Sequence, residues 1–143
     1  MPSSNLRWPD AALAGLACSM RTFSGPGLLA ARGRITGKPR LAVLIAAAGE
    51  LAADKSPKAS ARTRPPALAG RVGAGAFTGH RVAGAPGAAV GAVTAALGTY
   101  ATWRARTLVT QASGLPDPVV AVGEDIICEA LAAIATRPPS ADR

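Results

Sequence analysis

The stretch VAGAPGAAVGAVTAALGTYATW, residues Val82–Trp103, decides the fold class of this chain, because it contains no charged side chain. As a helix it would be about 33 Å long, enough to cross a bilayer hydrocarbon core of about 30 Å. A helix that is apolar on all sides needs either a membrane or a large protein core around it. With 143 residues and 3% aromatic residues, the chain is poorly equipped to build such a core. The sequence therefore predicts a membrane location.

Other apolar stretches, rich in alanine and glycine, lie on both sides of this one and alternate with arginine-rich connectors. They cover residues 10–31, 41–53, 67–79 and 119–136. Their pattern predicts an all-α fold, a multi-pass transmembrane helical bundle over residues 10–136. Residues 1–9 are interpreted as an N-terminal tail and residues 137–143 as a disordered C-terminal tail.

The net charge of +8 indicates an anionic partner of some kind. Nucleic acid, anionic lipid and cytoplasmic membrane loops all fit such a charge. The basic residues lie between apolar stretches, without aromatic residues interleaved for base stacking, so we expect the lipid bilayer and no nucleic acid. Cys18 and Cys128 lie in apolar stretches and His80 is the only histidine. We therefore expect no metal site and no cofactor.

Two arrangements of the segments fit the sequence. The segment Leu41–Ala53 would reach about 20 Å as a helix, too short to span, so it is interpreted as a re-entrant element or half-helix. The favoured arrangement has about four spans plus this element and puts both termini outside. Because Lys and Arg accumulate in cytoplasmic loops, it places Arg32 and Arg34 in the cytoplasm, on the opposite side from Arg7, Arg81 and Arg137.

A weak internal repeat supports the alternative arrangement. The string ALAG occurs at residues 12–15 and again at 67–70, and Gly-Glu occurs at 49–50 and 123–124. If residues 10–31 are split at the glycine-proline break, the chain becomes two inverted three-helix repeats with six crossings, the plan of many small transporters. This alternative removes the bias of basic residues to one side, which is why the four-span arrangement is favoured.

Ionisable residues within or beside the apolar segments are the main functional lead, because a charge in hydrocarbon is costly. The candidate residues form two acidic clusters and two counter-charges: Glu50, Asp54, Glu124 and Asp125 with Arg21 and Arg71. One hypothesis is a polar path that binds a cation or relays protons. The alternative is a set of structural ion pairs that fix helix register. Glu129 belongs to the second acidic cluster.

Small residues at a spacing of four indicate where helices pack. Gly75 with Gly79, and Gly87 with Gly91, would allow helix backbones to approach closely in lipid. In a chain so rich in glycine, packing within the molecule is favoured over a dedicated dimer motif.

Several strings occur in an order that goes beyond composition: RTFSGP at 21–26, AGELAADKSP at 48–57, RT and PPALAGR at 62–71, and LPDP at 115–118 leading to Glu124-Asp125. In this arrangement the chain resembles an uncharacterised family of small bacterial integral membrane proteins, domain of unknown function 4126. The resemblance implies a membrane location and a bundle of several helices, and it implies no activity.

These observations predict a small multi-pass protein of the bacterial inner membrane, a permease or channel-like subunit. The alternative function is a non-transporting scaffold that binds a partner through basic cytoplasmic loops. Short segments enclose little volume, so a homo-oligomer or a membrane partner protein fits either function. An enzyme is not expected, because the chain has no nucleophile elbow, no phosphate-binding loop and no histidine triad.

Overall fold

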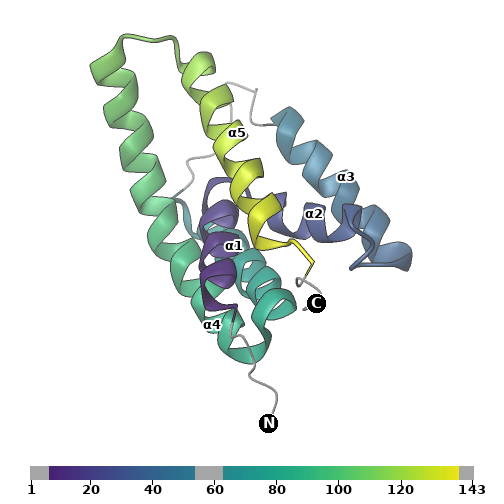
Figure 1. Cartoon of the computed structure of the whole chain (residues 1–143). Coiled ribbons are helices and arrows are strands. Elements are labelled where there is room, and N and C mark those ends of the chain that lie inside the picture. The colour runs from purple at the N-terminus through teal and green to yellow at the C-terminus, as the bar shows by residue number, and fades with distance from the viewer. Residues whose placement is uncertain (1–6, 54–62, 139–143) are drawn as a thin grey trace.

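The computed structural model describes residues 7–53 and 63–138, and over these ranges the chain is all-helical. Its helices are α1 (Trp8–Met20), α2 (Ser24–Ala31), α3 (Gly37–Ala53), α4 (Pro65–Ser113) and α5 (Asp117–Ala135) (Figure 1). The predicted all-α class is thus confirmed for the described residues. Among these helices, α4 is the one that is long and apolar enough to cross a membrane. Residues 1–6 and 139–143 of the predicted tails lie outside the described residues.

Helix α4 is bent into a hairpin whose two halves run antiparallel (Figure 1). Ala83 (φ −136°) and Gly84 (φ 70°, ψ −161°) leave helical geometry and divide it into residues 65–82 and 85–113. A residue without Cβ adopts the conformation of Gly84 readily. Pro86 follows in the first turn of the second half, where its missing N–H costs nothing. The predicted uninterrupted span Val82–Trp103 is therefore wrong at its start, since its first residues form the turn.

The two halves of α4 are held at backbone contact by glycines. A Cβ added at Gly75 would lie 2.5 Å from the carbonyl oxygen of Gly91, and one added at Gly79 would collide with the carbonyl oxygen of Gly87. The structure thus places the four small residues singled out in the sequence against one another, inside one hairpin. Close backbone approach brings many weak contacts without large side chains.

Helix α1 packs against this hairpin through further glycines. A Cβ added at Gly15 would meet the carbonyl oxygen of Gly91 and the hydroxyl of Thr94, and one added at Gly98 would lie 2.6 Å from Ser19 Oγ. Gly91 therefore touches both α1 and the first half of α4. Sequence analysis did not single out Gly15 or Gly98, whose role depends on which helix comes to lie beside them.

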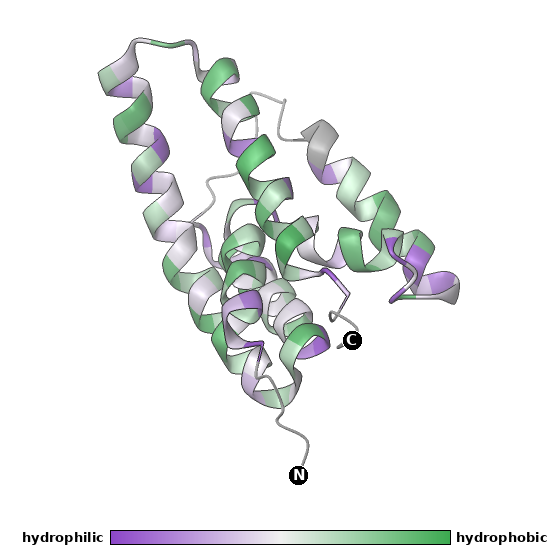
Figure 2. Cartoon of the chain, in the orientation of Figure 1, coloured by the Kyte–Doolittle hydropathy of each residue, from purple (hydrophilic) through white to green (hydrophobic). Residues whose placement is uncertain are grey.

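Small and polar side chains fill the interior, and large apolar side chains cover the outside. The apolar cluster between α1 and α5 consists of Ala17, Met20, Cys128 and Ala132, flanked by Leu28 and Leu131. By contrast, Leu97 is 68% exposed and Ile126 is 66% exposed. Figure 2 shows apolar residues spread along the outer helices α3, α4 and α5.

Both ends of the α1–α2 pair lie at the same end of the bundle. The guanidinium of Arg7, before α1, donates to the carbonyl oxygen of Arg137, after α5 (2.9 Å), and that of Arg32, after α2, donates to Thr136 Oγ1 (2.6 Å). At 13 and 8 residues, the two helices reach only about 20 Å and 12 Å. The pair therefore enters the bundle, turns at residues 21–23 and returns.

This arrangement corrects the favoured placement of the connectors. Arg34 and Arg81 each donate a hydrogen bond to the other's backbone carbonyl oxygen. The prediction that Arg32 and Arg34 lie opposite Arg7, Arg81 and Arg137 is therefore wrong. The error arose from treating residues 10–31 as one span, although Pro26 cannot continue a helix through Thr22.

The short helices of the bundle are therefore α1 and α2, and not the predicted segment 41–53. Helix α3 begins at Gly37, four residues before the predicted segment 41–53, and has 17 residues. The order of helical segments is that of the alternative arrangement, in which residues 10–31 are split and two sets of three helical segments follow each other. Helices α1, α2 and α3 form the first set, and the halves of α4 with α5 form the second.

Candidate functional site

The break between α1 and α2 is the centre of the candidate site. Helix α1 ends at Met20, and the next residue, Arg21, has an extended backbone (φ −137°, ψ 127°). Helix α2 starts at Ser24 and carries Pro26 in its first turn, where proline is tolerated. A continuous helix would press the proline ring against the carbonyl of Thr22, so the sequence itself forces the interruption.

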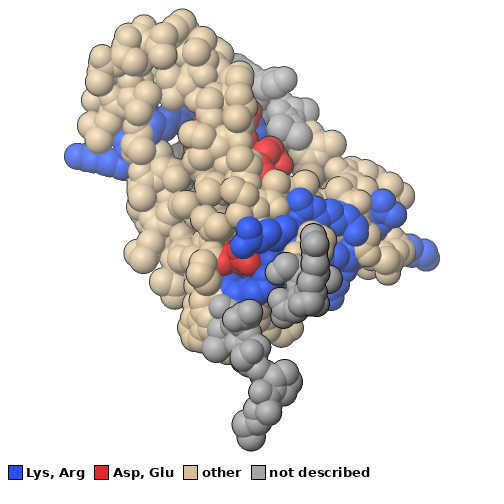
Figure 3. Space-filling view, viewed as in Figure 1, with Lys and Arg blue, Asp and Glu red and all other residues tan. Residues whose placement is uncertain are grey.

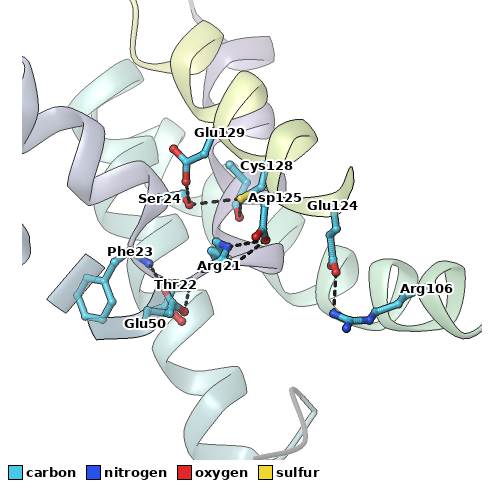
Figure 4. A network of polar contacts seen from close by, with 11 residues as sticks. Arg21, Thr22, Phe23, Ser24, Glu50, Arg106, Glu124, Asp125, Cys128 and Glu129 are labelled. Carbon is cyan, nitrogen blue, oxygen red and sulfur yellow. Dashed lines mark hydrogen bonds and ion pairs between the residues drawn. The ribbon is translucent and has the colours of Figure 1, made fainter. Parts of the chain in front are cut away.

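Glu50 of α3 binds the backbone at this break. Its Oε1 accepts a hydrogen bond from the N–H of Thr22, and its Oε2 accepts one from the N–H of Phe23, both at 2.8 Å (Figure 4). The first N–H groups of a helix have no partner within it and carry the positive end of its dipole. Thr22 and Phe23 lie directly before α2, so the carboxylate of Glu50 accepts hydrogen bonds from the backbone of the break and faces the positive end of the α2 dipole.

Arg21 joins the same break to α5. Its Nε and one terminal nitrogen donate to Asp125 Oδ1 at 2.9 and 2.5 Å. Arg21 is 6% exposed, whereas the side chain of Asp125 is 34% exposed. The pair therefore runs from the interior toward the surface, and it unites two residues that the sequence had proposed as charge and counter-charge.

A second contact of α2 with α5 lies beside this pair. The buried Ser24 donates from Oγ to Glu129 Oε1 at 2.6 Å, and Cys128 Sγ lies 3.3 Å from Ser24 Oγ. Glu129 is exposed. We call the whole set the break network; it consists of Arg21, Thr22, Phe23, Ser24, Glu50, Asp125, Cys128 and Glu129 (Figure 4).

Glu124 does not belong to the break network, although the sequence grouped it with Asp125. Its Oε2 accepts a hydrogen bond from Arg106 at 3.0 Å, on a different face of α5 from Asp125 (Figure 4). This pair lines a largely apolar cavity of about 360 Å³ between the second half of α4 and α5, together with Met20, Val109 and Val119. Neighbouring residues of a helix point about 100° apart, which explains why Glu124 and Asp125 have different partners.

The two remaining predicted residues are not placed at the break by any described contact. Arg71 is buried, 6% exposed, on the first half of α4. Asp54 lies outside the described residues.

Sequence reasoning placed Glu129 in the second acidic cluster but not among the candidate site residues, and it did not select Thr22, Phe23 or Ser24. Glu129 follows Asp125 by four residues, so the two share a helix face, a signal that could have favoured Glu129 over Glu124. The amides of Thr22 and Phe23 carry no side-chain signal, and their role depends on where the helix breaks. Ser24 could have been suspected only from its place directly before the Gly25-Pro26 pair.

The network is an array of charges and hydroxyls without a metal-binding geometry. Across residues 7–53 and 63–138, no group of three or more His, Cys, Asp or Glu side chains is placed to hold a metal ion.

The fold and the site together define an all-helical bundle with an interrupted helix pair and a polar network at the interruption. No protein-family model matches the chain, and no curated protein and no solved structure matches it. The resemblance to the uncharacterised bacterial membrane family stays a prediction.

Proposed function

We propose that this chain is a small multi-pass integral membrane protein of the bacterial inner membrane. The distribution of side chains supports a lipid environment. Leu97 and Ile45 are 68% and 63% exposed, while Arg21 and Thr99 are buried at 6% and 0%. Exposing such apolar side chains to water costs free energy, whereas lipid tails surround them with apolar groups and remove that cost. Tight packing through glycine is typical of the same environment.

The dimensions of the hairpin support the same proposal. Trp8 lies beside the arginines at one end of the bundle and is 44% exposed, and Trp103 is 45% exposed on the second half of α4. From the turn at Gly84 to Trp103 the helix rises about 29 Å, close to the thickness of a hydrocarbon core. Tryptophan prefers both interfaces of a bilayer. We propose that both halves of α4 and α5 span, that α3 spans with its 17 residues at the lower limit for a crossing, and that α1 and α2 form the re-entrant pair.

We further propose that the break network is a polar path for protons or a monovalent cation, so that the protein acts as a permease or channel-like subunit. In membrane proteins, interrupted helices are tolerated where they line a cavity or pathway, and transporters bind substrates at such points. The observation that carries the proposal is the contact of the interrupted backbone at Thr22 and Phe23 with Glu50, next to a buried arginine.

Charge favours a cation over an anion. The break network contains three carboxylates, those of Glu50, Asp125 and Glu129, and one guanidinium, that of Arg21. Asp125 neutralises Arg21, and Glu50 faces the positive end of α2. Among the described contacts, Glu129 is bound by the neutral hydroxyl of Ser24. Glu129 is therefore the carboxylate best placed to take up a proton or a cation, with Ser24 as the next oxygen inward.

Flux into proteoliposomes tests this function. The protein is reconstituted, and proton, Na⁺ and K⁺ movement is followed under an imposed potential. Glu129→Gln should reduce the flux at least tenfold without loss of insertion, because the amide cannot carry the charge. The matched control is Glu124→Gln, which changes the same residue type on the same helix outside the network. Absence of any flux, or equal flux in the Glu129→Gln protein, rules out the path.

A further inference from the structure

Five arginines from four separate parts of the chain gather at one end of the bundle, which we call the basic end. They precede α1, follow α2, end the first half of α4 and follow α5: Arg7, Arg32, Arg34, Arg81 and Arg137. Figure 3 shows basic side chains concentrated at this end, on the side where α1 begins and α5 ends. The described contacts include one carboxylate here, that of Asp10, which lies 2.6 Å from Arg7 and 3.5 Å from Arg137.

Three of these arginines, Arg32, Arg34 and Arg81, donate hydrogen bonds to uncharged oxygen atoms. Arg32 donates to the carbonyl oxygen of Ala133 (3.0 Å) and to Thr136 Oγ1 (2.6 Å). Arg34 and Arg81 donate to each other's carbonyl oxygens. These contacts fix the side chains without neutralising their charge, and a guanidinium has five N–H donors, so each retains donors for another acceptor.

The mutual contact of Arg34 and Arg81 brings like charges together at the surface, where Arg34 is half-buried and Arg81 is exposed. Desolvation and the neighbouring charges of Arg7, Arg81 and Arg32 lower the pKa of Arg34. Positive charges this close repel one another, and a bound anion would relieve that repulsion. Phosphate matches fixed guanidinium groups, because their planar N–H donors bind its oxygens in pairs.

The position of the basic end in the fold indicates the source of that phosphate. Trp8 follows Arg7 directly and is 44% exposed. Tryptophan beside arginine is typical of the headgroup level of a bilayer. We propose that the basic end binds the phosphate headgroup of an anionic phospholipid, with Arg34 and Arg81 as the paired ligands and Arg32 beside them. This inference rests on the proposed membrane location.

Native mass spectrometry of the purified protein tests the inference. The protein is exchanged into detergent with equal amounts of phosphatidylglycerol and phosphatidylcholine, and retained lipid is counted. Phosphatidylglycerol should dominate, and Arg81→Gln should reduce its excess about fivefold, since one arginine near anionic lipid contributes about that factor. The matched control is Arg81→Lys, which keeps the positive charge at the basic end and should keep most of the excess.

A second measurement keeps the inference testable if Arg81→Gln does not fold. On the unaltered protein, phosphatidylglycerol should raise the thermal unfolding temperature more than phosphatidylcholine does, and inorganic phosphate at millimolar concentration should not reproduce this gain. Equal effects of the two lipids, or a full gain with phosphate alone, overturn the lipid site.

Alkaline extraction separates this inference from the proposed membrane location. Release of the protein by alkali overturns both. Retention in the membrane without preference for phosphatidylglycerol overturns the lipid site alone, and the flux measurement is independent of it.

Discussion

Arg21 and Asp125 form a two-bond contact that links the end of α1 to the middle of α5. Both Nε and a terminal nitrogen of Arg21 donate to the same oxygen, Oδ1. Of the two partners, only Asp125 reaches the surface appreciably, at 34% side-chain exposure. The contact therefore compensates a charge that cannot itself reach solvent.

Asp125→Ala should lower the free energy of unfolding by about 2 kcal/mol, because it removes charged hydrogen bonds from a buried guanidinium. Thermal unfolding in detergent measures this change. The double replacement Arg21→Met with Asp125→Leu should recover most of the loss, since neither charge remains. If the double variant is less stable than Asp125→Ala, the pair does not act as described.

Glu50→Ala should cost about 1–2 kcal/mol, comparable to the loss of a helix cap, because the amides of Thr22 and Phe23 lose their acceptor. Hydrogen exchange should accelerate at these two amides before it changes in α5. Glu50→Gln keeps one acceptor oxygen and should fall between the unaltered protein and Glu50→Ala. Unchanged exchange at Thr22 in Glu50→Ala would contradict the contact.

Gly91→Ala should destabilise the hairpin by about 1–3 kcal/mol, the usual cost of an overpacked interior. Its added Cβ would collide with the carbonyl oxygen of Gly75. Gly73→Ala is the matched control, because a Cβ at Gly73 would meet no atom within 4 Å. That control should be neutral or slightly stabilising, given the better helix propensity of alanine. Equal unfolding temperatures for the two variants would show that the halves of α4 do not pack through Gly91.

Gly84→Ala should also destabilise the protein, for a different reason. No atom lies within 4 Å of an added Cβ, but φ is +70° with ψ at −161°. That region is nearly restricted to glycine and costs other residues about 1–3 kcal/mol. Gly123→Ala, on α5 with open space and no positive φ, is the control, and thermal unfolding compares the two. An unaffected Gly84→Ala protein would mean that the turn adopts another conformation.

Cysteine labelling in intact cells tests the proposed spans. Thr36 and Ala85 are exposed at the basic end, and Ala112 is exposed near the other end of α4. In a protein with Cys18 and Cys128 replaced by alanine, single cysteines at 36 and 85 should react alike with an impermeant reagent. A cysteine at 112 should behave oppositely. Different reactivity at 36 and 85 would contradict these spans and support the arrangement favoured by the sequence, in which residues 10–31 cross once.

The parts of this structure that depend on local chemistry could be predicted from the sequence, and those that depend on helix pairing could not. The all-α class follows from composition, and Arg21 and Asp125 could be selected because charges in apolar segments are costly. The sequence does not show which carboxylate contacts Arg21. Asp125 and Glu124 are neighbours on α5, and the rotation of α5 about its axis decides which of them points toward Arg21.

The positions of Arg34 and Arg81 also depend on helix pairing and could not be predicted from the sequence. Counting basic residues assigned them to opposite sides, because the count assumed that residues 10–31 cross once. The Gly25-Pro26 pair gave a local signal for the break, but not for the direction in which α2 continues. That direction is set by contacts with α5, such as those of Arg32 with Ala133 and Thr136.

The contact between Arg21 and Asp125 has a consequence for biogenesis. The two residues are 104 positions apart, so a ribosome makes the arginine well before the carboxylate that neutralises it. Helices α1 and α2 are also each too short to be anchored in a membrane alone. The contact that neutralises Arg21 can therefore form only after α5 has been synthesised.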